Sequence, residues 1–149
     1  MKIALVCSSG GHLRELMAVK DAIKGYKHFW VTFKSPITKM TLKGEKFYLV
    51  DDPRRNLLKF IPLFFKSLNI LLKEKPDVVI TTGAGVAIPF YLAAKLFGKK
   101  LVFIESFART EMPSATGRVL YPFADLFLVQ WKKNLKYYGE NAKYVGPVY

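Results

Sequence analysis

A histidine next to two glycines is the first feature of the sequence that could do chemistry. Residues 7–16 read CSSGGHLREL, between an apolar run and a segment with helical spacing. An unperturbed imidazole has a pKa of about 6.5, so His12 could take a proton from a reacting group near neutral pH. It could equally be a structural or helix-capping histidine. The residues alone leave both roles open.

Glycines follow two of the apolar runs, and each group precedes a segment with helical spacing. Gly10 and Gly11 follow the first run, and Gly83 and Gly85 follow the run at 77–82, in TTGAG. Backbone N–H groups at the start of a helix attract anions, and glycine lets a phosphate approach the backbone closely. Neither loop has the lysine of a P-loop or the full spacing of a dinucleotide-binding fingerprint. Phosphate binding and plain tight turns both remain possible.

A cluster of charged residues follows another apolar run. Glu105, Ser106, Arg109 and Glu111 lie within the seven residues ESFARTE. Charges placed directly after a buried strand must pair with each other, with a ligand or with water. The guanidinium of Arg109 could hold a diphosphate or a carboxylate through two hydrogen bonds. The alternative is an internal Glu–Arg pair that stiffens the loop.

Composition narrows the classes of protein to consider. The 149 residues suit one domain (1–149), and 51% hydrophobic residues argue against disorder. The net charge of +13 fits nucleic acid, an anionic membrane or a phosphorylated substrate. No nucleic-acid-binding motif is present, so nucleic acid is not an expected partner. Cys7 is the only cysteine. It ends an apolar run, which predicts a buried, unreactive thiol in a cytosolic protein.

Strands that alternate with helices must position these loops. The expected strands cover 2–7, 28–33, 46–50, 77–83, 100–105, 125–130 and 143–146, and the expected helices cover 13–25, 56–73 and 86–97. This alternation predicts an α/β fold with a Rossmann-like, doubly wound, mainly parallel sheet. In such sheets, ligands bind outside the carboxyl ends of the strands. The three loops are therefore expected to lie along one edge of the sheet.

The segment 56–75, NLLKFIPLFFKSLNILLKEK, is strongly apolar but is interrupted by polar residues. Its length and interruptions argue against a membrane span. Beside Arg54 and Arg55, it could lie in the interface of an anionic bilayer, or it could be a crossover helix packed on the sheet. Both uses are compatible if one face points inward and a phenylalanine-rich tip points outward. The candidate membrane residues are Leu57, Lys59, Phe60, Phe64, Phe65 and Lys66.

Three stretches carry a resemblance to a known family: SSGGHLREL, TTGAGVAIPFYLAAKLFGKKLVFIES and ESFARTEMPSATGRVLYPFADLFLVQW. They resemble the asparagine-linked glycosylation protein fourteen family and its prokaryotic exopolysaccharide relatives. They are more distantly similar to the N-terminal half of the transferase that adds N-acetylglucosamine to the undecaprenyl-diphosphate precursor of peptidoglycan. The resemblance implies the acceptor-binding half of a GT-B glycosyltransferase, inactive without a separate donor-binding chain that holds the UDP-sugar.

The resemblance also implies the chemistry and the residues that perform it. The reaction would be an inverting transfer, expected from UDP-N-acetylglucosamine to a polyprenyl-diphosphate-linked sugar, with no metal and no cofactor. His12 would be the base for the attacking hydroxyl or a ligand of the lipid diphosphate, and Glu105 is the rival base. Gly83 and Gly85 would form the floor of the acceptor pocket. The expected acceptor- and phosphate-binding residues are Ser9, Gly10, Gly11, Gly83, Gly85, Ser106 and Arg109.

The chain departs from the eukaryotic members in one respect. Those proteins begin with a membrane-anchoring helix, whereas this sequence begins with the first expected strand. Peripheral attachment to the cytoplasmic face of the membrane, through the 56–75 segment, is therefore expected instead. One alternative is a non-catalytic membrane anchor or scaffold for a separate catalytic subunit. Another is a nucleotide-binding Rossmann protein that acts alone, which the missing fingerprint disfavours.

Overall fold

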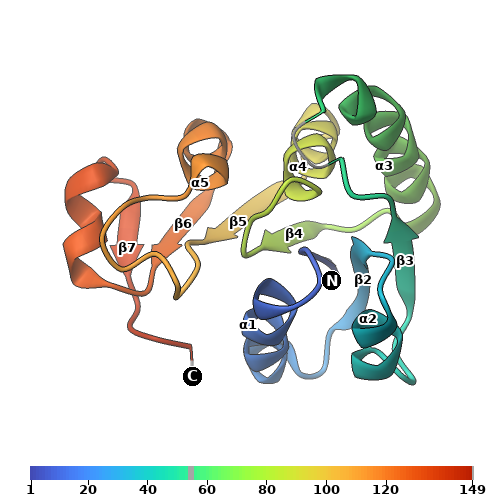
Figure 1. The fold of residues 1–149 in the computed structure, drawn as a ribbon, viewed down its shortest axis with the longest axis horizontal. Coiled ribbons are helices and arrows are strands. Elements are labelled where there is room, and N and C mark those ends of the chain that lie inside the picture. Colours follow the sequence, from blue (N-terminus) through green and yellow to red (C-terminus); the bar gives the residue numbers. More distant parts are fainter. Residues whose placement is uncertain (54–55, 149) are drawn as a thin grey trace.

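The computed structural model describes residues 1–53 and 56–148, apart from the side chain of Leu57. Over these residues the chain forms one sheet of seven parallel strands, in the order β3-β2-β1-β4-β5-β6-β7 (Figure 1). The strands are β1 Lys2–Val6, β2 Lys27–Phe33, β3 Phe47–Val50, β4 Val78–Thr81, β5 Lys100–Ile104, β6 Leu126–Val129 and β7 Ala142–Tyr144. The predicted Rossmann-like sheet is confirmed, and every strand pair in it is parallel.

Helices cover both faces of this sheet (Figure 1). The α-helices are α1 Gly11–Val19, α2 Pro36–Thr41, α3 Phe60–Glu74, α4 Ala87–Leu96 and α5 Ala115–Leu120. Short 3-10 helices are η1 Lys20–Ile23, η2 Leu57–Lys59, η3 Tyr121–Phe123 and η4 Lys132–Tyr137. The predicted helix at 13–25 is thus α1 followed by η1, and the one at 56–73 is η2 followed by α3.

The strands read as continuous apolar runs because both of their faces are buried. In β1, Ala4 and Val6 pack with residues of α3 and α4 in one core cluster. Ile3 and Leu5 point to the other face and pack with residues of α1. The sequence analysis missed the two six-residue helices, α2 and α5, and placed the last strand at 143–146 instead of 142–144.

The chain reverses its direction of winding between β1 and β4. From β1 it proceeds to β2 and β3 on one side, and from β4 it proceeds to β5, β6 and β7 on the other. Such a switch point opens a crevice at the carboxyl ends of the strands. Because β1, β4 and β5 are neighbours, the three loops singled out in the sequence leave the sheet side by side. Their predicted placement on one edge is confirmed.

Within residues 1–53 and 56–148, no helix combines the length and the apolar character needed to cross a bilayer.

Candidate active site

Two helices begin at this edge without a capping side chain. The residues at the N-cap positions of α1 and α4, Gly10 and Val86, make no capping hydrogen bond through a side chain. Gly10 precedes α1 with a φ of 87°, a conformation that L residues rarely adopt. Helices α2 and α5, in contrast, are capped by Ser35 and Ser114. The N–H groups at the start of α1 are therefore available to an anion from the crevice. At the start of α4, in contrast, the N–H of Ala87 already donates to the carbonyl of Ala84 at 3.0 Å, and Pro89 has no N–H.

The loop after β4 holds a strained backbone next to this edge. Gly83 has a φ of 104° and Ala84 a φ of 76°. A left-handed conformation costs a residue with a Cβ about 1–2 kcal/mol. The neighbouring hydroxyl of Thr82 donates a hydrogen bond to the carbonyl of His12, at 3.1 Å. This contact ties the second loop to the first turn of α1.

His12 lies in the first turn of α1 with its imidazole half-buried. Its side chain is 29% exposed, and a Cβ added to Gly83 would lie 3.8 Å from the ring carbon Cε1. Burial lowers the pKa of His12 below its ordinary value of 6.5, and the positive charge of Arg109 lowers it further. The carboxylates of Glu15 and Glu105 act against this shift. The imidazole is therefore neutral at pH 7, the form a general base requires.

Glu105 lies underneath the third loop and is fully buried. One carboxylate oxygen accepts from the N–H of Ser106 at 3.0 Å, and the other accepts from the N–H of Ser114 at 3.0 Å and from the hydroxyl of Tyr138. A carboxylate held by three donors beneath a loop stabilises that loop. This position favours His12 over Glu105 as the base.

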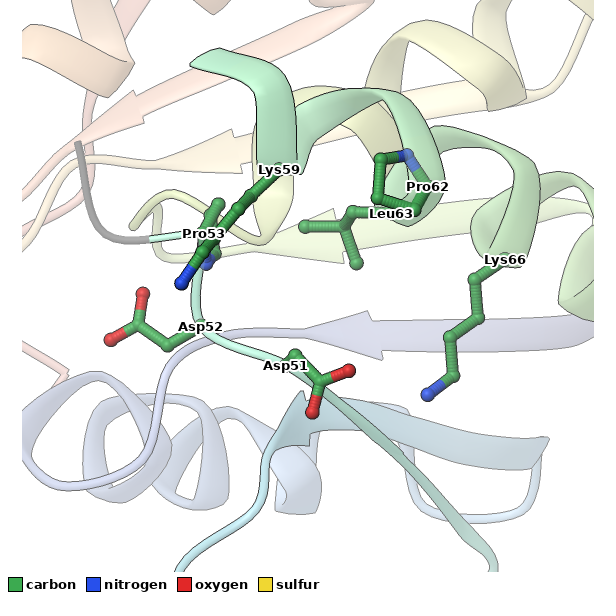
Figure 2. Close-up of a pocket in the computed structure, with 7 residues that line it drawn as sticks. All are labelled: Asp51, Asp52, Pro53, Lys59, Pro62, Leu63 and Lys66. Atoms are coloured by element: carbon green, nitrogen blue, oxygen red, sulfur yellow. The ribbon is translucent and has the colours of Figure 1, made fainter. Parts of the chain in front are cut away.

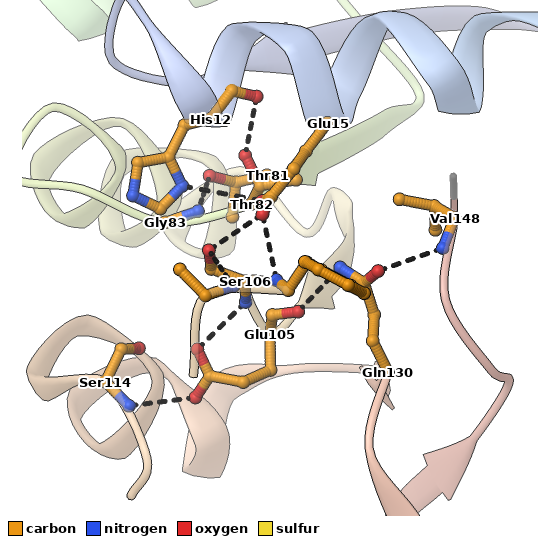
Figure 3. A network of polar contacts seen from close by, with 12 residues as sticks. His12, Glu15, Thr81, Thr82, Gly83, Glu105, Ser106, Ser114, Gln130 and Val148 are labelled. Carbon is orange, nitrogen blue, oxygen red and sulfur yellow. Dashed lines mark hydrogen bonds and ion pairs between the residues drawn. The ribbon is translucent and has the colours of Figure 1, made fainter. Parts of the chain in front are cut away.

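Ser106 is also buried, and it connects the third loop to α1 (Figure 3). Its hydroxyl donates to Oε1 of Glu15 at 2.8 Å, and the N–H of Phe107 donates to the same oxygen at 2.8 Å. Ser106 thus supports the site from inside the protein. Sequence reasoning missed Glu15, although its spacing of three residues from His12 places both on one face of a helix.

Arg109 extends from this loop with an exposed side chain. Its carbonyl accepts a hydrogen bond from Nδ2 of Asn134 at 2.5 Å, and the carbonyl of Phe107 accepts one from the indole of Trp131 at 2.7 Å. Glu111 forms an ion pair with Lys133, so it is not the partner of Arg109 that the sequence allowed. These two bonds hold the backbone of the loop, and the Arg109 guanidinium forms no ion pair with a side chain in residues 1–53 and 56–148.

The sequence of residues 53–148 matches the family model described as "Oligosaccharide biosynthesis protein Alg14 like". That match covers more than half of the chain.

The chain belongs to the Alg14-like family.

Curated relatives carry the name UDP-N-acetylglucosamine transferase subunit. The Schizosaccharomyces pombe protein is 42% identical over 78 residues, a match that covers 49% of this chain and 37% of that protein. The Rattus norvegicus protein is 25% identical over 178 residues, covering 98% of this chain and 82% of that protein. The Homo sapiens protein is 24% identical over 180 residues, covering 99% and 83%.

Two solved structures show how the Alg14-like chain relates to larger enzymes. MurG of Acinetobacter baumannii superposes with a TM-score of 0.80 at 20% identity, over 97% of this chain and 46% of that chain. A UDP-N-acetylglucosamine 2-epimerase of Rickettsia bellii superposes with a TM-score of 0.78 at 16% identity, over 99% and 45%. At these identities the likeness shows the fold alone. The chain corresponds to less than half of either protein.

The other predicted loop residues of the Alg14-like chain lie at the same edge. Ser9 is half-buried between β1 and α1, and Gly85 is half-buried just before α4. Cys7 is fully buried, and burial raises the pKa of its thiol to about 12. The expectation that this thiol is buried is confirmed. Among the described residues, no three His, Cys, Asp or Glu side chains are placed to hold a metal ion.

A pocket of about 360 Å³ opens at the carboxyl end of β3 (Figure 2). It is lined by Asp51, Asp52, Pro53, Lys59, Pro62, Leu63 and Lys66. In the sheet, β3 lies two strands from β1, so the pocket is on the same edge as His12. Lys59 and Lys66, predicted to face a membrane, thus share this pocket with two carboxylates.

Beside this pocket, α3 and α4 enclose an apolar groove of about 240 Å³. Its lining residues are Phe60, Ile61, Phe64, Ile88, Pro89 and Leu92. Around it, Leu58, Ile61 and Phe65 are 75%, 58% and 60% exposed. Phe65 is thus on the surface, whereas Phe60 and Phe64 are half-buried in the groove. Arg54, Arg55 and the side chain of Leu57, also named from the sequence, lie outside the described residues.

Proposed function

We propose that the chain is the acceptor-binding, membrane-recruiting subunit of a two-chain glycosyltransferase. The enzyme would transfer N-acetylglucosamine from UDP-N-acetylglucosamine to a polyprenyl-diphosphate-linked sugar, with inversion. Curated relatives are named subunits of a UDP-N-acetylglucosamine transferase, which supports both the donor and the need for a second chain.

The observation that carries the proposal is a neutral imidazole at an edge that also offers binding groups for an anion. Nε2 of His12 would take the proton from the acceptor hydroxyl as that oxygen attacks the anomeric carbon of the donor. The bond between this carbon and the diphosphate would break as the new bond forms, and UDP would leave with the electron pair. A single displacement of this kind inverts the anomeric configuration. It needs one base and no covalent intermediate on a carboxylate of the enzyme.

The diphosphate of the lipid acceptor needs positive partners next to this base. The uncapped start of α1 supplies backbone N–H groups, and Arg109 supplies a guanidinium for two hydrogen bonds. The effect of Arg109 on the pKa of His12 supports their closeness in one site. The base and the diphosphate site would then lie on one side of a cleft that the donor-binding chain closes.

Attachment at the cytoplasmic face of the membrane would bring a lipid-linked acceptor to this edge. The exposed apolar residues of η2 and α3 are suited to the interface of a bilayer. The chain's net charge of +13 favours an anionic lipid surface. The exposed Leu58 and Ile61 lie in η2 and the first turn of α3, which follow the carboxyl end of β3.

A histidine substitution separates catalysis from anchoring. The chain has two histidines, and His28 lies on β2, bound to Glu45 at the opposite edge of the sheet. Radiolabelled N-acetylglucosamine transfer to lipid is measured with the candidate donor-binding chain present, for His12→Ala and for the matched control His28→Ala. We expect His12→Ala to lower turnover by about 10²–10⁴-fold with the complex intact. Unchanged turnover would favour the non-catalytic anchor.

A further inference from the structure

We propose that Glu15 is the positioning residue of His12: its carboxylate fixes the ring as the Nδ1–H tautomer and leaves Nε2 free to accept a proton. This inference rests on the proposed role of His12 as the base.

Two buried polar atoms on one face of α1 point toward each other. Nδ1 of His12 and Oε2 of Glu15 are 3.8 Å apart, and neither has a hydrogen-bond partner within the described residues. A buried polar atom without a partner costs about 1–3 kcal/mol, so a bond between the two would remove both penalties. At 3.8 Å the atoms are beyond hydrogen-bond distance. Contacts between catalytic groups are often long without substrate and shorten in the complex.

The carboxylate of Glu15 is held so that only one oxygen can serve His12. Its other oxygen, Oε1, accepts from the hydroxyl of Ser106 and the N–H of Phe107, each at 2.8 Å (Figure 3). Glu15 is 3% exposed, so solvent does not compete for it. A carboxylate oxygen accepts hydrogen bonds and does not donate them. Facing Oε2, the Nδ1 atom must carry the hydrogen, and Nε2 then has the free electron pair.

This arrangement gives Glu15 a second effect during turnover. When Nε2 takes the proton of the acceptor hydroxyl, the ring becomes positively charged next to a buried negative charge. The attraction stabilises that state and strengthens the Nδ1–H bond to Oε2. Glu15 would act through His12 without touching the substrate.

A merely structural Glu15 would tie α1 to the third loop and do nothing else. Glu15→Gln separates the two roles because its amide has nearly the same shape as the carboxylate. Its oxygen can still accept from Ser106 and Phe107, while its N–H₂ group faces Nδ1. The ring would then need Nδ1 as an acceptor, which moves the hydrogen to Nε2. Trp131→Phe is the control, since it removes another hydrogen bond of the third loop, from the indole to the carbonyl of Phe107, and leaves the Glu15 carboxylate facing His12.

The first test measures the tautomer directly in the isolated full-length chain. Nitrogen-15 NMR of histidine-labelled protein resolves two rings, and His28→Gln assigns them. We expect Nδ1–H for His12 in the wild type and in Trp131→Phe, and Nε2–H in Glu15→Gln. An Nε2–H ring in the wild type, or one tautomer in all three proteins, would overturn the proposal.

The second test uses the assembled transferase. We expect Glu15→Gln to lower kcat by about 10²-fold or more with KM unchanged, because the base has the wrong tautomer. Trp131→Phe should stay within about threefold of the wild type, equivalent to about 0.65 kcal/mol. If His12→Ala is inactive while Glu15→Gln keeps full kcat, the positioning role alone is wrong. If His12→Ala is fully active, the proposed function is wrong, and the catalytic role of Glu15 with it.

Discussion

The hydroxyl of Tyr138 donates a hydrogen bond to the buried carboxylate of Glu105, 33 positions earlier in the chain. Glu105 directly follows strand β5 and Tyr138 directly follows η4, so this bond joins the start of the third loop to the segment that leads into β7. A Cβ added at Gly117 would lie 2.7 Å from the same carboxylate, so the packing there allows no side chain. The start of the loop that carries Arg109 is therefore held in place by tight packing and by hydrogen bonds to Glu105.

Removal of the Tyr138 hydroxyl should destabilise the protein. In Tyr138→Phe the buried Glu105 carboxylate loses one of its donors, which lowers the free energy of unfolding by about 1.5–3 kcal/mol. Urea denaturation measures this change. Tyr137→Phe is the control, because Tyr137 is 42% exposed and its change should stay within about 0.5 kcal/mol. Equal stability of the two variants would show that the Tyr138–Glu105 bond contributes nothing.

The strands and the position of the site could be predicted from the sequence because both follow from local patterns. A strand buried on both faces is a short apolar run, and β1, between β2 and β4, is such a run. Parallel winding then places the loops after β1, β4 and β5 on one edge. The missed helices α2 and α5 are six residues long, yet Ser35 and Ser114 stand as caps before them. These two serines are N-cap residues, so their positions in the sequence could have predicted both helices.

Buried polar contacts could not be predicted in the same way. Glu15 looks like an ordinary helical glutamate, and its burial depends on Ser106, which is 91 positions away. Tyr138 likewise becomes important only when η4 packs against the third loop. The polar residues that hold Glu15 and Glu105 come from segments far apart in the sequence. Only the folded chain brings them together.

Gly11→Ala should weaken acceptor binding without affecting the fold. No heavy atom of the described residues lies within 4 Å of a Cβ added at Gly11, so the methyl group fits the free chain. The same methyl group would stand among the N–H groups at the start of α1, where the diphosphate is proposed to bind. We expect KM for the lipid acceptor to rise about tenfold, equivalent to 1.4 kcal/mol, with unchanged thermal unfolding. If Gly11→Ala has the same KM for the lipid acceptor as the wild type, the diphosphate does not bind at the start of α1.

The rate of transfer should depend on the protonation of His12 at acidic pH. Burial lowers the pKa of His12 below 6.5, so the base stays neutral at pH 6.5 and is protonated only at lower pH. We expect kcat/KM to be level above pH 6.5 and to fall as the pH drops through the lowered pKa. A profile that already falls well above pH 6.5 would contradict a neutral, buried base.

The same shift should appear in stability. Because the pKa of His12 is lower in the folded chain than in the unfolded chain, the unfolded state takes up the proton first as the pH falls. The free energy of unfolding should therefore decrease as the pH falls from above 6.5 through the lowered pKa. His12→Ala removes this contribution, whereas His28→Ala should leave it. Urea denaturation at a series of pH values tests both variants.

Phe65→Ser should weaken binding to anionic membranes. The ring is 60% exposed on α3, and its transfer into the bilayer interface would contribute up to about 1.5–3 kcal/mol, or ten- to hundredfold in the binding constant. Met40→Ser is the control, because Met40 is 80% exposed on α2, across the sheet from α3. Co-sedimentation with phosphatidylglycerol–phosphatidylcholine vesicles measures both. Equal binding of the two variants to the vesicles would show that Phe65 on α3 does not contribute to membrane binding.

The division of one transferase between two chains is the central claim, and reconstitution tests it most directly. Transfer of radiolabelled N-acetylglucosamine from its UDP donor to membrane lipid is measured with this chain, with the product of the adjacent gene as the candidate donor-binding chain, and with both. The account predicts lipid-linked product only when both chains are present. Product formed by this chain alone, or by the other chain alone at the full rate, would contradict it.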